Sequence, residues 1–149
     1  DIAEGDTIAI PNDGSNETRA LLLLQDLGYI TLADGIDASS NATIEAIVDN
    51  PLNLEITEMN AENIPPILAD VAFGIINGNY ALQADLTGDD ALASESADSD
   101  AAQTYANILA VRAGEEDSAK TQALVTALTS ETCRQFIEET YSGAVVPIF

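Results

Sequence analysis

The chain has 149 residues and a hydrophobic fraction of 46%, which suffices for one domain with a buried core and argues against a disordered segment. Four Lys and Arg against 26 Asp and Glu give a net charge of −22, which excludes nucleic acid and bare anionic lipid as partners because both attract clustered positive charge. The lack of histidine and the single cysteine exclude His-dependent catalysis, intramolecular disulfides and thiolate zinc sites.

The first predicted elements are a strand and a helix. Residues 7–10 are β-branched and apolar and end at a cluster of turn residues, which is typical of a strand. A broad apolar face then predicts a helix over 16–27, with Asp13 or Ser15 as its N-cap and Gly28 just past its C-terminus.

The middle of the chain alternates short helices with strands. The pattern predicts a short amphipathic helix over 44–48, a strand with one exposed face over 54–58 and a short helix over 64–68. The continuous apolar run 71–76 predicts a strand buried on both faces, and a helical turn follows at 80–84.

The last third begins with an acidic stretch, 86–103, which predicts a long solvated loop. A further strand is expected over 105–112, followed by amphipathic helices over 118–128 and 131–141. The apolar tail 144–149 must pack against another surface. Strands that alternate with helices predict an α/β fold with a mostly parallel sheet.

No catalytic or metal-binding motif stands out. The chain has no nucleophile elbow, phosphate loop or dinucleotide fingerprint, and its acidic stretches lack the spacing of an EF-hand loop. Among 26 carboxylates, none forms a pair that the sequence singles out for hydrolysis. We therefore predict no catalytic residue, no metal and no cofactor, and we interpret the charge as a solubility or salt adaptation in preference to a docking surface.

Three side chains are candidates for ligand binding. Arg19 lies one turn into the helix that follows the first strand, where free helix N–H groups and a guanidinium together suit a carboxylate or phosphate. An ion pair with Glu17, Asp13 or another neighbour is the alternative, and position alone does not decide between the two roles. Asn77 ends a predicted strand and Asn107 lies inside another, so each amide either satisfies backbone groups or binds a ligand.

Five distinctive segments occur in an order that matches one known family. Residues 5–25, GDTIAIPNDGSNETRALLLLQ, are similar to the signature IPNDPTNxGRALLLLQ. The other four are DNPLNL (49–54), IINGNYA (75–81), YANIL (105–109) and FIEETYSGAVVP (136–147), which resemble ENPKNL, VINGNYA, YANIL and FIEEKYKGAVIP. By these segments the chain resembles the methionine-binding lipoproteins of the NlpA/MetQ family over essentially its whole length.

The resemblance implies a two-lobed, periplasmic-binding-protein-like (type II) architecture that closes on an amino acid, with methionine as the expected ligand. It implies that Arg19 binds the ligand carboxylate, together with the helix start at Asn12 and Ser15, and that Asn77 and Asn107 bind the ligand's other polar groups. It also implies an extracytoplasmic lipoprotein that delivers its ligand to an ABC permease and ATPase complex in the membrane and performs no chemistry.

Two positions depart from the family pattern, since Gly14 stands in place of a proline and Thr18 in place of a glycine. Family members also carry a segment before the matched region, with the lipid-modified cysteine and much of the first lobe. We therefore expect residues 1–104 to form the ligand-binding second lobe and residues 105–149 to be the crossover strand and helices of the first lobe, whose N-terminal portion is absent. Those helices are expected to repack on this lobe or to self-associate.

Two other functions remain open on the sequence alone. One is a protein–protein association module with an emptied ligand site. The less favoured one is a carboxylate-based hydrolase, which a carboxyl group of strongly raised pKa in a cleft would support.

Overall fold

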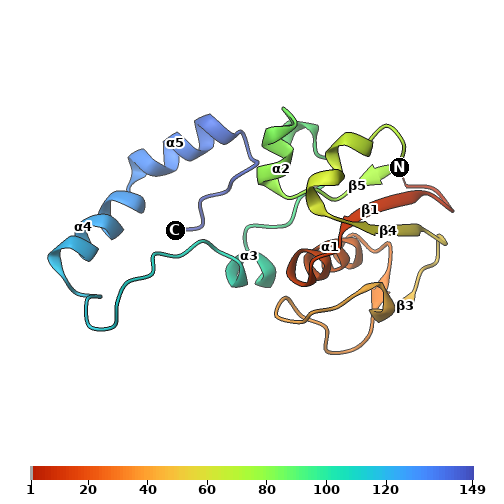
Figure 1. The fold of residues 1–149 in the computed structure, drawn as a ribbon, viewed down its shortest axis with the longest axis horizontal. Coiled ribbons are helices and arrows are strands. Elements are labelled where there is room, and N and C mark those ends of the chain that lie inside the picture. Colours follow the sequence, from red (N-terminus) through yellow and green to blue (C-terminus); the bar gives the residue numbers. More distant parts are fainter. Residues whose placement is uncertain (1) are drawn as a thin grey trace.

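The computed structural model describes residues 2–149, and all its strands lie in the first half of the chain (Figure 1). A parallel sheet is built from β1 (Thr7–Pro11), β4 (Glu55–Met59) and β5 (Phe73–Gly74) in the order β4-β1-β5. A smaller antiparallel sheet pairs β2 (Thr31–Leu32) with β3 (Ile47–Asp49). The predicted α/β class with a mostly parallel sheet is therefore confirmed.

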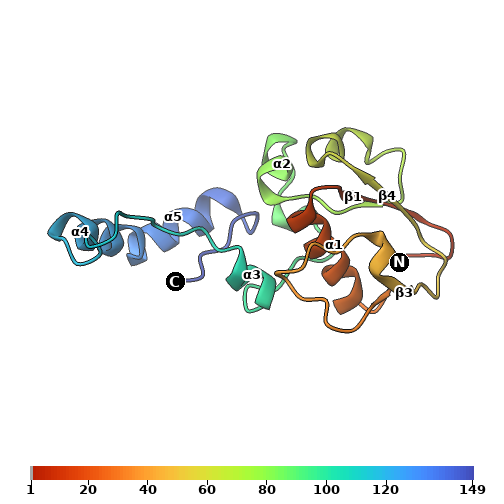
Figure 2. The same ribbon diagram turned by 60° about the horizontal axis from the view of Figure 1, so that its bottom comes forward.

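The central strand β1 is buried from Ile8 to Pro11 because both faces of the sheet are covered. Ile8 and Ile10 are 1% and 0% exposed and belong to the same apolar cluster as Leu21 and Leu24 of α1 (Gly14–Asp26), which lies along one face (Figure 2). Each such buried side chain contributes roughly 1.5–3 kcal/mol. The packing of α1 on β1 therefore supplies much of the stability of this lobe.

The opposite face of the sheet is lined by small residues. Ala9 of β1 and Gly74 of β5 are register partners, and a Cβ at position 74 would lie 2.8 Å from side-chain carbons of both Ile64 and Leu68. These two residues flank the 3₁₀ helix η3 (Pro65–Ile67), which follows η2 (Ala61–Asn63). The lack of a side chain at Gly74 therefore lets this short helical segment approach the sheet closely.

The ends of α1 follow the predicted capping pattern. Asp13 is the N-cap, and its carboxylate accepts a hydrogen bond from the Asn16 backbone N–H at 3.3 Å. Gly28 follows the helix with a φ of +78° and donates its N–H to the carbonyl oxygen of Gln25 at 2.8 Å. Glycine adopts this left-handed conformation without strain, so the helix stops where the sequence predicts.

Three predicted helices or strands differ from the structure, and the loop predicted over 86–103 contains η4 (Gly88–Asp90) and most of α3 (Asp100–Thr104). The helix predicted over 44–48 is wrong: the 3₁₀ turn η1 (Ile44–Ala46) leads into β3, because β-branched residues there pair with the short strand β2 that the sequence analysis missed. The strand predicted over 71–76 shrinks to β5 and is half-buried. The strand predicted over 105–112 is also wrong, because the described sheets offer it no neighbouring strand to pair with.

The rest of the chain is helical and extended. The remaining elements are α2 (Gly78–Gln83), η4 (Gly88–Asp90), α3 (Asp100–Thr104), α4 (Ala119–Leu128) and α5 (Glu131–Tyr141). The last two agree closely with the predicted helices, and both ribbon views show them standing apart from the sheet (Figures 1 and 2). Among the described residues, no helix has both the length and the apolar character needed to cross a bilayer.

The segment 105–149 exposes many apolar side chains. Ile108 is 85% exposed and Phe136 is 59% exposed. Other large apolar residues of the same segment that are exposed are Leu109, Val111, Leu124, Val125, Leu128, Val145, Val146, Ile148 and Phe149. We call these residues together the C-terminal apolar surface. Such a surface is unusual for a domain that works alone.

The C-terminal segment reaches the lobe through a close backbone approach just beyond α5. The N–H of Gly88 donates to the carbonyl oxygen of Ser142 at 3.1 Å. A Cβ at position 78, at the start of α2, would collide with the carbonyl oxygen of Ala144. Residues 142–144 therefore pack directly against the first residues of α2 and η4.

We predict that Thr18→Val lowers the free energy of unfolding by about 1–3 kcal/mol, because it leaves buried backbone groups without partners. Thr18 is fully buried, and its hydroxyl accepts the Ala42 N–H at 2.8 Å and lies 2.8 Å from the Ser40 carbonyl oxygen. Urea denaturation measures the change. Thr18→Ser, which keeps the hydroxyl, is the control and should lose less stability; equal losses would mean that the side-chain volume matters and the hydrogen bonds do not.

Candidate functional site

A crevice of about 300 Å³ opens at the carboxyl-terminal edge of the parallel sheet. Asn12 enters it directly after β1, Asn60 directly after β4, and Tyr80 comes from α2, which follows β5. The complete lining is Asn12, Asp13, Asn16, Asn60, Ala61, Glu62 and Tyr80. Since β4 and β5 flank β1 on opposite sides, the crevice lies where open parallel sheets usually bind ligands.

The lining of this crevice is polar and carries negative charge. Three amides, a phenol and the carboxylates of Asp13 and Glu62 are present, and none of the seven lining residues is Lys or Arg. This lining suits a donor such as an ammonium group. An anionic group would instead need a positive charge at the border of the crevice.

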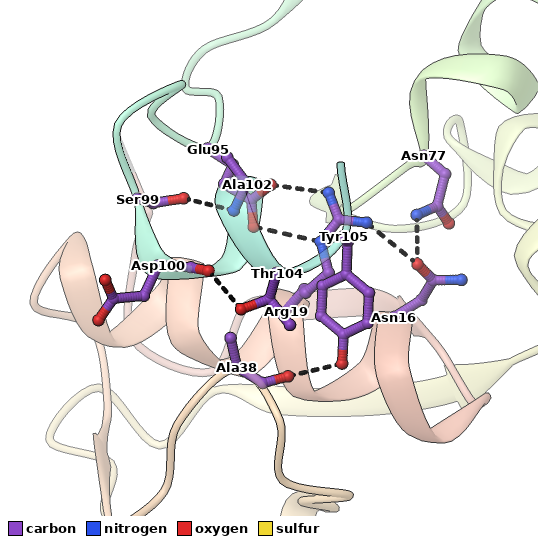
Figure 3. A network of polar contacts seen from close by, with 10 residues as sticks. All are labelled: Asn16, Arg19, Ala38, Asn77, Glu95, Ser99, Asp100, Ala102, Thr104 and Tyr105. Carbon is purple, nitrogen blue, oxygen red and sulfur yellow. Dashed lines mark hydrogen bonds and ion pairs between the residues drawn. The ribbon is translucent and has the colours of Figure 1, made fainter. Parts of the chain in front are cut away.

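Arg19 supplies a positive charge beside Asn16, which lines the crevice (Figure 3). Its guanidinium is paired with Glu95: Nε donates to Oε1 at 3.2 Å and Nη2 donates to Oε2 at 2.7 Å. Nη1 donates to Oδ1 of Asn16 at 3.4 Å, and Asn16 lines the crevice. The ion partner of Arg19 is thus neither Glu17 nor Asp13, which were the sequence alternatives, but a residue from the acidic stretch.

Tyr105 covers one face of the same guanidinium. Its ring centroid lies 5.4 Å from the Arg19 Cζ atom, within the range of a cation–π interaction. The phenol O–H donates to the carbonyl oxygen of Ala38 at 2.5 Å, which fixes the ring on the loop that follows β2. Arg19 is therefore held on an edge by Glu95 and on a face by Tyr105.

Asn16 joins Arg19 to Asn77. Asn77 Nδ2 donates to Asn16 Oδ1 at 2.9 Å, while Asn16 Nδ2 donates to the Asp13 carboxylate at 2.9 and 3.1 Å. The other end of the Asn77 amide, Oδ1, is buried and accepts no hydrogen bond from any described residue. A buried acceptor without a partner costs free energy, and a water or a ligand group that donates a hydrogen bond to it would remove this cost.

The predicted site residues fall into two groups. Arg19 and Asn77 meet through Asn16, and Asn12 lies at the crevice, where its N–H donates to the Met59 carbonyl oxygen at 2.9 Å. Ser15 and Asn107 lie outside this arrangement. The Ser15 hydroxyl donates to Asp13 at 3.4 Å and does not line the crevice. Asn107 is exposed and makes no hydrogen bond with the described residues, because 105–112 is not the predicted strand.

The sequence analysis missed Asn16, Glu95 and Tyr105. Asn16 carried a usable signal, since it lies one helical turn before Arg19 on the same helix face. Glu95 carried none, because it stands in an exposed acidic stretch 76 residues away from Arg19. Among the described residues, no group of three or more His, Cys, Asp or Glu is arranged to hold a metal ion.

Two carboxyl groups face each other between α1 and β4. Glu17 is 3% exposed, accepts the Ile44 N–H at 3.2 Å and faces Glu58 of β4. Burial, followed by the hydrogen bond and charge of Glu58, raises the pKa of Glu17 to about 7. Glu17 does not line the crevice, so this raised pKa lacks the access to substrate that a hydrolase needs.

A parallel sheet whose carboxyl edge carries a polar crevice defines the class: an α/β lobe of the periplasmic-binding-protein type. The model of the NlpA lipoprotein family matches residues 1–149, and the chain belongs to this family.

Relatives and solved structures agree with this assignment. The chain is 40% identical to the methionine-binding lipoprotein MetQ of Bacillus subtilis over 99% of its length and 54% of the relative's. It is 39% identical to the membrane lipoprotein TpN32 of Treponema pallidum, over 98% and 53% of the two lengths. A nutrient-binding protein of Burkholderia cenocepacia, solved with methionine bound, is 43% identical with a TM-score of 0.83, over 100% of this chain and 61% of that one. The chain thus spans about half the length of the curated relatives it matches.

We predict that Glu17→Gln makes the free energy of unfolding less dependent on pH. Because the pKa of Glu17 in the folded state lies above its ordinary value of 4.5, the protonated side chain stabilises the fold. This contribution is complete below pH 4.5 and is lost as the pH rises through about 7. The unfolding free energy of the wild type should therefore fall more steeply between pH 5 and pH 8 than that of the variant. Glu115→Gln, which removes one exposed carboxylate, is the control; the idea fails if both variants change the slope equally.

Proposed function

We propose that this chain belongs to an extracytoplasmic substrate-binding protein that binds an amino acid, methionine, for uptake by an ABC transporter. The observation that carries the proposal is the placement of Arg19 beside a polar crevice at the carboxyl edge of the sheet, joined to the crevice by Asn16. Membership of the NlpA lipoprotein family and the methionine-bound relative support the choice of ligand. The names of the relatives support a lipoprotein of the cell envelope.

In this proposal the two charged ends of the amino acid are bound by different groups. The carboxylate takes N–H groups of Arg19, with the helix start at Asn12 and Ser15 nearby. The ammonium donates to nearby acceptors: the carboxylate of Asp13, which lines the crevice, and Oδ1 of Asn77, which has no partner among the described residues. A zwitterion suits a crevice whose lining is negative and whose border is positive.

The methionine side chain needs an apolar surrounding that the crevice does not supply, because its lining is polar. We propose that a second lobe supplies it, with residues 1–104 as the ligand-binding lobe and 105–149 as part of the other. Asn107 then reaches the ligand as a residue of that second lobe. The exposure of Ile108 next to Asn107 supports a partner for this segment.

The proposal assigns the chain no chemistry. The relatives reported above are named as binding proteins and lipoproteins. The one carboxyl group with a strongly raised pKa among the described residues, Glu17, is buried away from the crevice. Neither observation favours a carboxylate-based hydrolase.

Self-association is a second property that one observation favours. The C-terminal apolar surface is exposed in the isolated chain, and burying it against another copy would be favourable.

We predict that calorimetric titration of L-methionine into the chain, and into any longer polypeptide of which it forms part, gives binding that Arg19→Ala weakens about 10–100-fold, the scale of a lost charge-assisted hydrogen bond. Arg19→Lys should recover only part of the affinity, because an ammonium lacks the two-pronged donor geometry. D-methionine and other amino acids are titrated in parallel. Binding of another amino acid alone would correct the ligand, and no binding by any form would favour the association module.

We predict that the chain sediments as a concentration-dependent oligomer. Replacing Ile108 and Phe136 together by Ser should shift it towards monomer, because both are exposed parts of the C-terminal apolar surface. Sedimentation velocity measures the shift. Leu92→Ser is the matched control, since Leu92 is 84% exposed but lies outside that surface. A wild type that stays monomeric at all concentrations would refute the prediction.

A further inference from the structure

The edges of the Arg19 guanidinium face different parts of the fold. The guanidinium has five N–H groups. The Nε–H and one N–H of Nη2 form its side edge, and they donate to the two carboxylate oxygens of Glu95. One N–H of Nη1 points to Asn16, and Figure 3 shows Asn16 and Glu95 on opposite sides of the guanidinium. Three of the five donors thus have acceptors among the described residues, and two remain for a ligand.

We propose that Glu95 is a positioning residue, whose carboxylate orients the Arg19 guanidinium so that its end edge, Nη1 and Nη2, is presented to a ligand carboxylate at the crevice. This inference rests on the proposed function, since it concerns the same site. Glu95 does not compete with the ligand for Arg19. Glu95 binds the side edge of the guanidinium, formed by Nε and Nη2, whereas a competing carboxylate would occupy the end edge beside Asn16.

The local fold explains how residues on either side of one short helix both hold Arg19. Glu95 precedes α3 and Tyr105 follows it, so the two residues approach Arg19 from the two ends of the same short helix. Ala101 of α3 is 5% exposed, which fixes the helix against the lobe. Ser99 caps α3 by accepting the Ala102 N–H at 3.0 Å. We call Glu95 and Tyr105 together the Arg19 clamp.

The Arg19 clamp restricts the Arg19 side chain, which matters in a chain with a net charge of −22. An arginine side chain has many rotamers, and here 26 acidic residues are available as alternative partners. Without Glu95, the guanidinium would be free to turn toward Asp13 or Glu62, which line the crevice, and would then block the ligand. A side-on pair with Glu95 removes this freedom before the ligand arrives, which is how preorganisation raises affinity.

The test compares Glu95→Gln with wild type in two measurements. The first is the ¹⁵N–¹H signal of the Arg19 Nε–H, which is readily assigned because the chain has three arginines. In wild type this proton should exchange slowly with water, and in the variant its signal should move to the position of a free arginine. The second is the affinity for L-methionine, which should fall about tenfold, the scale on which loss of a group that orients a ligating side chain acts.

Asp98→Asn is the matched control, since Asp98 is exposed in the same stretch and its side chain has no partner among the described residues. It should change neither measurement. Glu95→Asp, which keeps the charge but shortens the reach, should give an intermediate loss, and melting temperatures show whether each variant is folded. Selectivity for methionine over methioninamide should also fall in Glu95→Gln, which a purely structural role would leave unchanged.

Two results would overturn the inference. If Glu95→Gln binds methionine as tightly as wild type, or more tightly, then Glu95 does not position Arg19 for the ligand. If the Nε–H signal is the same in both proteins, the pair does not orient the guanidinium. A wild type that binds no amino acid while its Nε–H depends on Glu95 would instead remove the proposed function, and the ligand role of Glu95 with it.

Discussion

The burial of β1 is the constraint on which the rest of the structure depends. Ile8 and Ile10 pack under α1, and Ala9 faces the short helical segment on the other side of the sheet. This double burial leaves the strand no freedom to shift, because moving it by one residue would exchange its two faces. The start of α1, three residues beyond the strand, is therefore fixed relative to the sheet edge. Asn12, Asn16 and Arg19 take their places from that single connection.

At the carboxyl edge of the parallel sheet, one positive side chain lies near several negative ones. Arg19 lies among the side chains of Asn16, Asn77 and Glu95 and is the cation of the described network. Amides bridge the positive group to the acidic lining of the crevice without adding charge. A neutral ligand with separated charges fits this arrangement better than a simple anion, because each of its ends meets the opposite sign.

The sequence was sufficient wherever function and fold depend on neighbours along the chain. The strand 7–10, the cap at Asp13 and the stop at Gly28 all follow from local pattern and position. Arg19 and Asn77 could be expected at one site because both follow parallel strands, whose carboxyl ends share an edge. Helices α4 and α5 were also predictable, since both begin at serine caps and α5 has a clear apolar periodicity.

Contacts between distant segments were not predictable. Glu95 looks like one more solvated carboxylate until the fold brings it to Arg19, and Glu17 looks like a favourable first-turn charge until β4 brings Glu58 against it. The segment 105–112 has the composition of a strand, but composition cannot supply the neighbouring strand that a ladder requires. The same reason makes Asn107 the least constrained of the predicted site residues.

The close approach of residues 142–144 to α2 links two regions that are otherwise separate. Gly78, which leaves room for the Ala144 carbonyl oxygen, is the residue directly after Asn77. A side chain at position 78 would push residues 142–144 and the start of α2 apart, and would so displace the neighbouring Asn77 amide, which donates to Asn16. The lack of a side chain at Gly78 thus ties the packing of the C-terminal segment to the position of one polar group beside Asn16.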